Sequence, residues 1–327
     1  MPELPEVTTT VSGINSECTK WTIIDVWTDL AVVKPTRIDF FETIKYLPYF
    51  KKFVKNIKGQ KIINATRRGK NILINLENKK TILVHMKMTG HMMVGLYDYD
   101  KKENKWAPHK EEKNMALQDP FNRFVHVVFT LQKYNISGGK TSGDIKHLVL
   151  CDARKFAKVA LLENNPDHAK HLGTHGPEPI GQNKKPDISF TDFVLALDSA
   201  PANKRAIKSL LLDTRTIAGI GNIYSDELLF KANIHPESIW SKIPNPARQL
   251  MHREMLNVLK RGIDFGGDSM SDYRNIYGQR GEFQNNHNAY RKTGEKCSKK
   301  SCTGKIIRKI INSRSSHFCA VHQKLYK

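Results

Sequence analysis

The 327-residue chain lacks the features of a membrane or secreted protein. It has no stretch of about 18 apolar residues, the length that a helix needs to cross a bilayer. Residues 1–6 have neither the basic start nor the apolar run that a secretory signal requires. No internal repeat or heptad array is present, which argues against a solenoid or a coiled coil. We therefore expect a folded intracellular protein.

Cysteine is scarce and unevenly distributed. The five cysteines form an odd set, and three of them, Cys297, Cys302 and Cys319, lie close together near the C-terminus. Disulfide frameworks use even sets spread over a small secreted chain. The cysteine pattern therefore suits a metal site better than a disulfide framework.

Acidic residues are also few. The chain has 53 Lys and Arg against 32 Asp and Glu, which gives a formal net charge of +21. The excess is largest in residues 285–327, which hold eleven basic side chains and one acid, Glu295. Such a charge favours a polyanionic partner, above all nucleic acid. A basic tail alone would also fit a disordered segment or a membrane surface.

Hydrophobic periodicity predicts a β-rich first half. Residues 5–15 place Val7, Val11 and Ile14 on one helical face. Alternating segments then predict strands, at residues 22–27, 61–67, 71–76, 81–88, 124–131 and 147–162. Polar stretches at 97–122 and 132–146 are expected to be mobile surface insertions.

The second half is predicted to be helical. A proline-rich linker at 176–186 precedes segments with a helical period, at residues 190–197, 204–212, 223–232 and 247–261. A short hairpin between cysteine pairs ends the chain. We expect three domains, over residues 1–180, 187–284 and 285–327.

The C-terminal hairpin carries a zinc-binding pattern. Four residues separate Cys297 from Cys302, and two separate Cys319 from His322, as in the paired knuckles of a zinc finger. The alternative is a set of incidental thiols and a surface histidine. A tail this short has too little core to fold alone, so one structural zinc ion would supply its stability. Arg314 falls at the turn of the hairpin, where its guanidinium could grip a phosphate.

A glycine-rich turn at residues 218–224 forms a second motif. We expect its glycines to end one helix and Asn222 to cap the next. Free N–H groups at such a helix start form a natural seat for phosphate. Any tight turn between helices could show the same pattern, so this motif alone is weak.

Taken in order along the chain, these motifs resemble the formamidopyrimidine-DNA glycosylase and endonuclease VIII family. The matching segments are residues 1–6, 67–70, 85–90, 152–156, 176–179, 219–236 and 284–297. The resemblance implies an α+β fold, with an N-terminal β-sandwich flanked by helices, a helix-two-turn-helix domain and a zinc-finger hairpin. The chain departs from the usual two Cys-x2-Cys pairs through its four-residue spacing and His322. Lys155 stands where many members have a second arginine.

The resemblance implies that Pro2 is the nucleophile, once Met1 is removed. An α-amino group with a pKa of about 8 is partly free base at neutral pH. A secondary amine of this kind can form an iminium with a sugar carbon. Without the other motifs, Pro2 would be only the residue that follows the initiator methionine, with no catalytic role. Glu3 matches the family's acid and base, and the other matches to catalytic residues are Glu6, Lys70 and Glu227. Glu6 and Glu227 could instead be ordinary helix acids.

Further matches imply contacts with DNA. The predicted phosphate clamp consists of Lys70, His85, Asn222, Tyr290 and Arg314. Alternation along the strand at 81–88 predicts that His85 and Lys87 face away from Met86 and Met88. The side chains predicted to fill the gap left by an everted nucleotide are Met88, Arg154 and Phe156. Without the resemblance, Met88 and Phe156 would be assigned to a core.

The resemblance implies a bifunctional DNA glycosylase and abasic-site lyase of base excision repair, acting as a monomer on damaged duplex DNA. A Schiff base at Pro2 would undergo β- and then δ-elimination. Residues 267–284 resemble the flexible loop of members that prefer 8-oxoguanine and formamidopyrimidines, although a disordered connector would also be glycine-rich. The alternatives are an endonuclease VIII-like enzyme for oxidised pyrimidines and a non-enzymatic zinc-dependent DNA-binding protein. Pro2 and Glu3 argue against the last.

Overall fold

The structure is a computed structural model that describes residues 1–137, 140–163, 165–182, 186–200, 205–270 and 272–327. Contacts divide the chain into two compact units. The first unit comprises Met1–Pro2, Glu6–Leu172 and Gly266–Gly281, and the second comprises Glu3–Pro5, Gly173–Phe265 and Glu282–Lys327. Within the described ranges, no helix is both long and apolar enough to cross a membrane.

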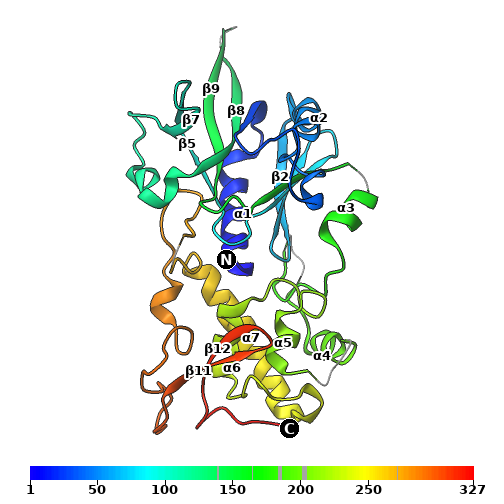
Figure 1. Cartoon of the computed structure of the whole chain (residues 1–327), viewed down its shortest axis with the longest axis vertical. Coiled ribbons are helices and arrows are strands. Elements are labelled where there is room, and N and C mark those ends of the chain that lie inside the picture. Colours follow the sequence, from blue (N-terminus) through cyan, green and yellow to red (C-terminus); the bar gives the residue numbers. More distant parts are fainter. Residues whose placement is uncertain (138–139, 164, 183–185, 201–204, 271) are drawn as a thin grey trace. The chain divides into compact units, whose positions relative to one another are not determined.

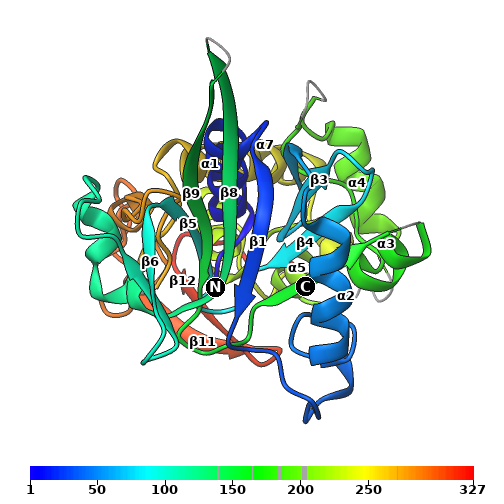
Figure 2. The same cartoon turned by 90° about the horizontal axis from the view of Figure 1, so that it is seen from above.

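The first unit is built around two antiparallel sheets of four strands (Figures 1 and 2). One sheet has the order β1-β8-β9-β5, with bounds Thr22–Thr28, Val125–Ser137, Lys140–Cys151 and His91–Gly95. The other has the order β10-β4-β3-β2, with bounds Lys158–Leu162, Thr81–His85, Asn71–Leu76 and Ile62–Arg68. Its helices are α1 (Leu4–Cys18), α2 (Leu47–Ile57) and α3 (Asn165–Leu172).

One core joins the two sheets. It contains side chains from both, such as Phe129 on β8 and Ile74 on β3, together with Ile14 on α1 and Phe53 on α2. A sheet must bury its apolar face against another layer, and here the layers are a second sheet and two helices. The expected β-sandwich with flanking helices is confirmed.

The first sheet is buried on its outer face as well. Met92 and Val94 on β5 point into the shared core, whereas Met93 joins a second cluster with Tyr97 and Leu117. That cluster belongs to residues 97–122, which form a hairpin of β6 (Tyr97–Asp100) and β7 (Lys105–Pro108) and two 3-10 turns, Met115–Gln118 and Pro120–Arg123. Residues 97–122 thus form an insertion between β5 and β8, as predicted, and its few apolar residues cover the outer face of the sheet.

The second expected insertion, residues 132–146, continues β8 and β9 as a paired ribbon. Its register runs from Gln132 opposite Ile145 to Ser137 opposite Lys140. The paired ends of these strands extend beyond the rest of the first unit in both views (Figures 1 and 2). Residues 138–139, which the insertion includes, lie outside the described residues.

Three other expectations about elements were inaccurate. The strand expected to reach Met88 ends at His85, because Lys87 has a left-handed backbone with φ 57°. Met86 is therefore buried while Met88 is exposed, so the predicted alternation fails. The segment 147–162 is broken between β9 and β10. The sequence analysis also missed α2, although Phe53 and Ile57 are spaced as on one helical face, and α3, which has no apolar face.

The second unit is helical. Its helices are α4 (Phe190–Asp198), α5 (Ile207–Leu212), α6 (Asn222–Lys231) and α7 (Asn245–Asp264), with 3-10 turns at Trp240–Lys242 and Phe283–Asn286. A hairpin of β11 (Ile306–Ile311) and β12 (Arg314–Cys319) follows (Figure 1). The main core of this unit lies among the helices and includes Leu4, Trp240 and Met255. The first residue expected in α5, Lys204, and residues 183–185 of the expected linker are outside the described ranges.

Candidate active site and nucleic-acid interface

The N-terminus is anchored in the second unit by Glu3. Its side chain is only 2% exposed, and its carboxylate accepts hydrogen bonds from the backbone N–H groups of Ile223 (3.0 Å) and Tyr224 (3.4 Å) at the start of α6. The neighbouring Leu4 N–H donates to the Gly219 carbonyl (3.1 Å). The positive end of the α6 dipole thus faces a carboxylate. Pro2, immediately before it in the chain, is buried.

Gly221 gives Glu3 the room that it needs. A Cβ atom at Gly221 would lie 2.2 Å from the carboxyl carbon of Glu3, far inside a van der Waals contact. Gly221 is also the N-cap of α6, and Asn222 is its first residue. The prediction that Asn222 caps the helix was therefore wrong. The phosphate seat expected at residues 218–224 is likewise wrong for Ile223 and Tyr224, whose N–H groups bind Glu3.

Glu6 binds the backbone of residues 266–281 within the first unit. Its carboxylate accepts from the Asp268 N–H at 2.7 Å, and Gly267 brings the backbone close with φ 90°. A side chain at Gly267 would meet Glu6 at 2.8 Å, so glycine is required by both space and conformation. Glu6 is only 1% exposed. It therefore acts as a positioning residue for this segment.

Residues 266–281 are packed against the first unit. The Tyr273 hydroxyl donates to the Glu6 carbonyl (3.1 Å), and the Ile276 carbonyl accepts from the Val94 N–H (2.8 Å). Arg274 is buried and pairs with Asp119 (3.2 Å) of the covering insertion. A disordered connector is thus wrong for the described part of this segment, which excludes residue 271.

Glu227 has the same kind of role in the second unit. Its carboxylate accepts from the backbone N–H groups of Asn288, Ala289 and Tyr290, at 2.9–3.0 Å. The Asn288 side chain adds a bond of 3.1 Å. Four donors around one buried carboxylate fix the path of residues 288–290. Glu227 therefore places Tyr290, a residue of the predicted clamp.

Lys70 and His85 are the clamp residues of the first unit. Both lie in a region rich in basic side chains. Lys70 follows Gly69 in the tight turn between β2 and β3, and His85 ends β4. Burial first, and then Lys87, Lys70 and Lys158, lower the pKa of His85 to about 3. The Lys87 N–H donates to His85 Nδ1 at 3.0 Å, which leaves the proton of the neutral ring on Nε2. His85 can therefore offer a neutral N–H donor.

Asn222, Tyr290 and Arg314, the clamp residues of the second unit, differ in their surroundings. The Tyr290 ring packs edge-on against His317 on β12, with centroids 5.1 Å apart. Arg314 is exposed and directly follows the hairpin turn, where Asn312 and Ser313 adopt left-handed conformations. The Asn222 Oδ1 atom is buried and has no hydrogen-bond partner among the described residues. An orphaned acceptor of this kind marks a place where a donor is missing.

The three predicted gap-filling side chains are displayed on turns. Met88 and Phe156 are 42% and 45% exposed, and the Arg154 guanidinium lies over the Phe156 ring at 4.8 Å. Asp152 fixes the second turn, because its carboxylate accepts from the backbone N–H groups of Ala157 (2.6 Å) and Arg154 (3.3 Å). Large exposed apolar residues on rigid turns suit insertion between bases. The alternative core assignment of Met88 and Phe156 is excluded by their exposure.

A buried chain of hydrogen bonds, which the sequence analysis missed, connects that turn with residues 266–281. The Asn122 amide donates to the Gly278 carbonyl (3.2 Å), and its Oδ1 accepts from His91 Nε2 (2.9 Å). His91 Nδ1 lies 3.4 Å from the Thr89 carbonyl, and the Thr89 hydroxyl donates to Asp152. Burial lowers the pKa of His91. Only the tertiary fold brings these distant positions together.

Cys297, Cys302, Cys319 and His322 form the expected metal-ligand group. Their donor atoms lie within 4.8 Å of one another. The Cys302 and Cys319 sulfurs are 3.7 Å apart, close to the spacing of about 3.8 Å between two thiolates on a tetrahedral zinc ion. His322 Nε2 faces the Phe230 carbonyl (3.3 Å), so its Nδ1 is left to bind a metal, 3.1 Å from the Cys297 sulfur. The four residues fit a structural zinc ion.

A buried charge cluster, also missed from the sequence, joins the hairpin to α5 and α6. Lys208 and Asp226 are each 1% exposed and pair at 2.6 Å. Asp226 also accepts from the backbone N–H and ring Nδ1 of His317, both at 3.0 Å, and Lys208 donates to the Ser315 carbonyl at 2.7 Å. Burial lowers the pKa of Lys208, and the Asp226 charge opposes that shift. The cluster holds the strand that begins with Arg314.

The two units and their sites correspond to the two parts of a DNA-repair glycosylase. The family model described as the formamidopyrimidine-DNA glycosylase N-terminal domain matches residues 1–159, and the model of the H2TH domain of that enzyme matches residues 176–274. Together they account for most of the chain. The chain belongs to the formamidopyrimidine-DNA glycosylase family.

Individual relatives agree. Formamidopyrimidine-DNA glycosylase of Solibacter usitatus is 31% identical over 99% of this chain and 100% of its own, and that of Bacillus subtilis is 31% identical over 98% of each. Among solved structures, Lactococcus lactis Fpg bound to abasic-site DNA has a TM-score of 0.74 and 26% identity, over 98% of this chain and 99% of that chain. A mutant of the same enzyme, in complex with Fapy-dG DNA, also has a TM-score of 0.74.

Proposed function

We propose that the chain is a bifunctional DNA glycosylase and abasic-site lyase that removes oxidised bases from duplex DNA inside the cell. The observation that carries the proposal is the buried Glu3 carboxylate, held by the start of α6 one residue after Pro2. Family membership and the excess of basic residues support it. Relatives carry the name formamidopyrimidine-DNA glycosylase, and the structural neighbours were solved with damaged DNA.

The proposed chemistry begins at the Pro2 amine, which is free once Met1 is removed. Its nitrogen lone pair attacks C1′ of the damaged nucleotide, and the bond from C1′ to the base breaks. The departing base takes a proton from water, and opening of the sugar ring gives an iminium as Glu3 passes the proton lost by the Pro2 nitrogen to the ring oxygen. Loss of a proton from C2′ expels the 3′ phosphate, and a second elimination expels the 5′ phosphate. Hydrolysis of the iminium frees Pro2.

The other proposed residues bind or position DNA. Lys70, His85, Asn222, Tyr290 and Arg314 would hold phosphates, and Met88, Arg154 and Phe156 would fill the gap. Zinc, held by Cys297, Cys302, Cys319 and His322, would stabilise the hairpin that carries Arg314. Glu6 and Glu227 act through the backbones that they bind.

Oxidised purines are the favoured substrates. The support is the segment 266–281, which is held in place by Glu6. The left-handed Gly266 and Gly267 bring backbone N–H groups of this segment close to the Glu6 carboxylate. With the Asp268 N–H bound to Glu6, the fixed path of this segment would present its exposed Met270 to an everted base.

Single-turnover excision tests this preference. We expect 8-oxoguanine opposite cytosine to be released faster than thymine glycol opposite adenine. Replacing the exposed Met270 by Ala should slow 8-oxoguanine release selectively and leave abasic-site cleavage intact. Deleting the segment would be uninformative, because Tyr273, Arg274 and Ile276 belong to the packed interior. Faster release of thymine glycol would favour the endonuclease VIII-like alternative.

A further inference from the structure

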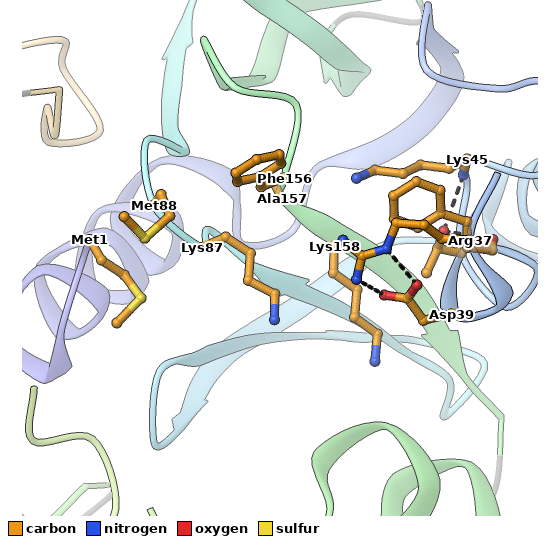
Figure 3. A pocket seen from close by; sticks show the side chains of 11 residues that line it. Met1, Arg37, Asp39, Lys45, Lys87, Met88, Phe156, Ala157 and Lys158 are labelled. Atoms are coloured by element: carbon orange, nitrogen blue, oxygen red, sulfur yellow. Dashed lines mark hydrogen bonds and ion pairs between the residues drawn. The ribbon is translucent and has the colours of Figure 1, made fainter. Parts of the chain in front are cut away.

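A cavity of about 300 Å³ in the first unit lies beside the predicted gap-filling residues (Figure 3). Met88 and Phe156 line it, and four basic side chains, Arg37, Lys45, Lys87 and Lys158, surround it. In Figure 3, Met1 and Met88 lie at the end away from Arg37. The volume is at the small end of the range for ligand pockets, the size of a compact polar group and its immediate neighbours.

Basic side chains outnumber the carboxylates around this cavity, where Asp152 acts on Lys45 and Glu42 acts on Lys158. Asp39 is the one carboxylate in its lining, and it is already paired with Arg37 through two bonds of 2.9 Å. Among the described residues, no carboxylate lies within ion-pairing distance of the Lys87 or Lys158 ammonium. Burial, and then the charge of Lys87, lower the pKa of Lys158. The two ammonium groups repel each other at a place where an anion would relieve the repulsion.

The cavity is not a chance group of surface lysines, because Lys45 in its wall is a buried side chain with fixed contacts. It is only 5% exposed, its Nζ donates to the Lys155 carbonyl at 2.7 Å, and it lies 4.3 Å from the centre of the Phe40 ring. The same ammonium therefore forms part of the cavity wall and holds the turn that displays Phe156. An anion in the cavity would be tied to the position of that turn.

The residues that line the cavity indicate which DNA strand would supply the bound anion. None of the proposed clamp residues for the damaged strand is among them, whereas two of the gap-filling residues are. Side chains that fill the gap left by an everted nucleotide would lie next to the unpaired base of the opposite strand. A phosphate close to that base would belong to the undamaged strand.

We propose that this cavity binds a backbone phosphate of the undamaged strand, with Lys87 and Lys158 as its direct contacts. The inference rests on the proposed function, because it requires damaged duplex DNA as the substrate. Arg37 stands at the rim, and Lys45 forms the fixed wall. The site would grip the strand opposite the lesion while Phe156 occupies the gap.

The test uses the full-length protein and a duplex with an uncleavable abasic analogue. We expect the double variant Lys87→Gln/Lys158→Gln to reduce the log-log salt slope of duplex binding by about one, at roughly 0.9 per lost phosphate contact. The slope for single-stranded DNA with the same analogue should not change. Lys133→Gln is the matched control, because Lys133 is an exposed lysine of the same unit outside the cavity.

A neutral phosphate analogue identifies the strand. Single methylphosphonate linkages placed along the undamaged strand should weaken wild-type binding at one position near the unpaired base, with no further loss in the double variant. An unchanged salt slope, or coupling to a linkage in the damaged strand, would overturn the proposal. Borohydride trapping of the wild type on lesion DNA is scored separately. If trapping succeeds and the slope does not move, the cavity proposal fails while the proposed function stands.

Discussion

Glu3 and the backbone groups that bind it form the most constrained point of the candidate site. The carboxylate occupies the N–H groups at the start of α6, and Gly221 leaves just enough room for it. Gly221 has φ −127°, a conformation that other residues adopt readily. Glycine is therefore required there for space and not for backbone freedom.

We expect Gly221→Ala to displace Glu3 and to lower base release by roughly 10²–10⁴-fold, the usual range for loss of a positioned acid or base. Stability should fall by about 1–3 kcal/mol, because displacing the buried carboxylate leaves backbone N–H groups of α6 without their acceptor. Single-turnover excision and thermal melting measure the two effects. In the double variant with Glu3→Ala, the loss should be no larger than for Glu3→Ala alone. Additive losses would contradict this account of Gly221.

His85 predicts a pH dependence of stability. Its folded pKa of about 3 lies below the ordinary value of about 6.5, so the unfolded chain binds a proton that the folded chain does not. The contribution of neutral His85 to the free energy of unfolding is complete above about pH 6.5. It is lost as the pH falls toward about 3, at no more than about 1.4 kcal/mol per pH unit. His85→Gln should therefore flatten the fall in Tm between about pH 7 and pH 5.

His109, which is half-buried, supplies the matched control. His109→Gln should leave the pH profile of Tm as in the wild type. Equal profiles for the wild type and His85→Gln would show that His85 is not held neutral.

Among the structural elements, the C-terminal hairpin depends most on groups outside its own strands. The apolar cluster of the hairpin is small, with Ile306 and Cys319 from its strands, and it is completed by Phe230 of α6, Ala289 and Cys297. Removing zinc with a chelator should unfold the hairpin, because its ligands supply most of its stability. Amide hydrogen exchange would show lost protection in residues 294–327, with the first unit unaffected, and DNA binding should weaken.

The ligand variants sharpen that prediction. His322→Cys should keep one zinc ion per chain, because cysteine also ligates zinc, whereas His322→Ala should lose it. Full zinc occupancy in His322→Ala would remove His322 from the ligand set.

The Lys208–Asp226 pair gives a second prediction for the hairpin. Asp226→Asn leaves a buried ammonium without its counter-charge, which costs about 3–5 kcal/mol for a pair of this kind. It also weakens two bonds to His317, so the strand that begins with Arg314 should loosen. Urea unfolding measures the loss. The apolar double variant Lys208→Met/Asp226→Leu should recover much of it, and a double variant as unstable as Asp226→Asn would contradict the buried-charge explanation.

For the whole molecule, periodicity and local motifs predicted the β-rich half, most helices and the zinc ligands, because those signals are carried by nearby residues. The resemblance predicted the sandwich and the helix-two-turn-helix unit. The features that were not predicted depend on contacts between residues that are distant in sequence. The 97–122 insertion covers a sheet, the start of α6 binds Glu3 from the other end of the chain, and Asn122 joins segments 156 positions apart. No local pattern encodes such pairs.

Covalent trapping shows directly whether the Pro2 nitrogen attacks the sugar. Wild-type protein is mixed with a duplex that contains 8-oxoguanine, in the presence of borohydride, and the cross-linked protein is digested and sequenced by mass spectrometry. We predict a reduced sugar adduct on the N-terminal peptide, at Pro2, with no adduct in protein that retains Met1. An adduct on a lysine, or equal trapping when Met1 is retained, would contradict the claim.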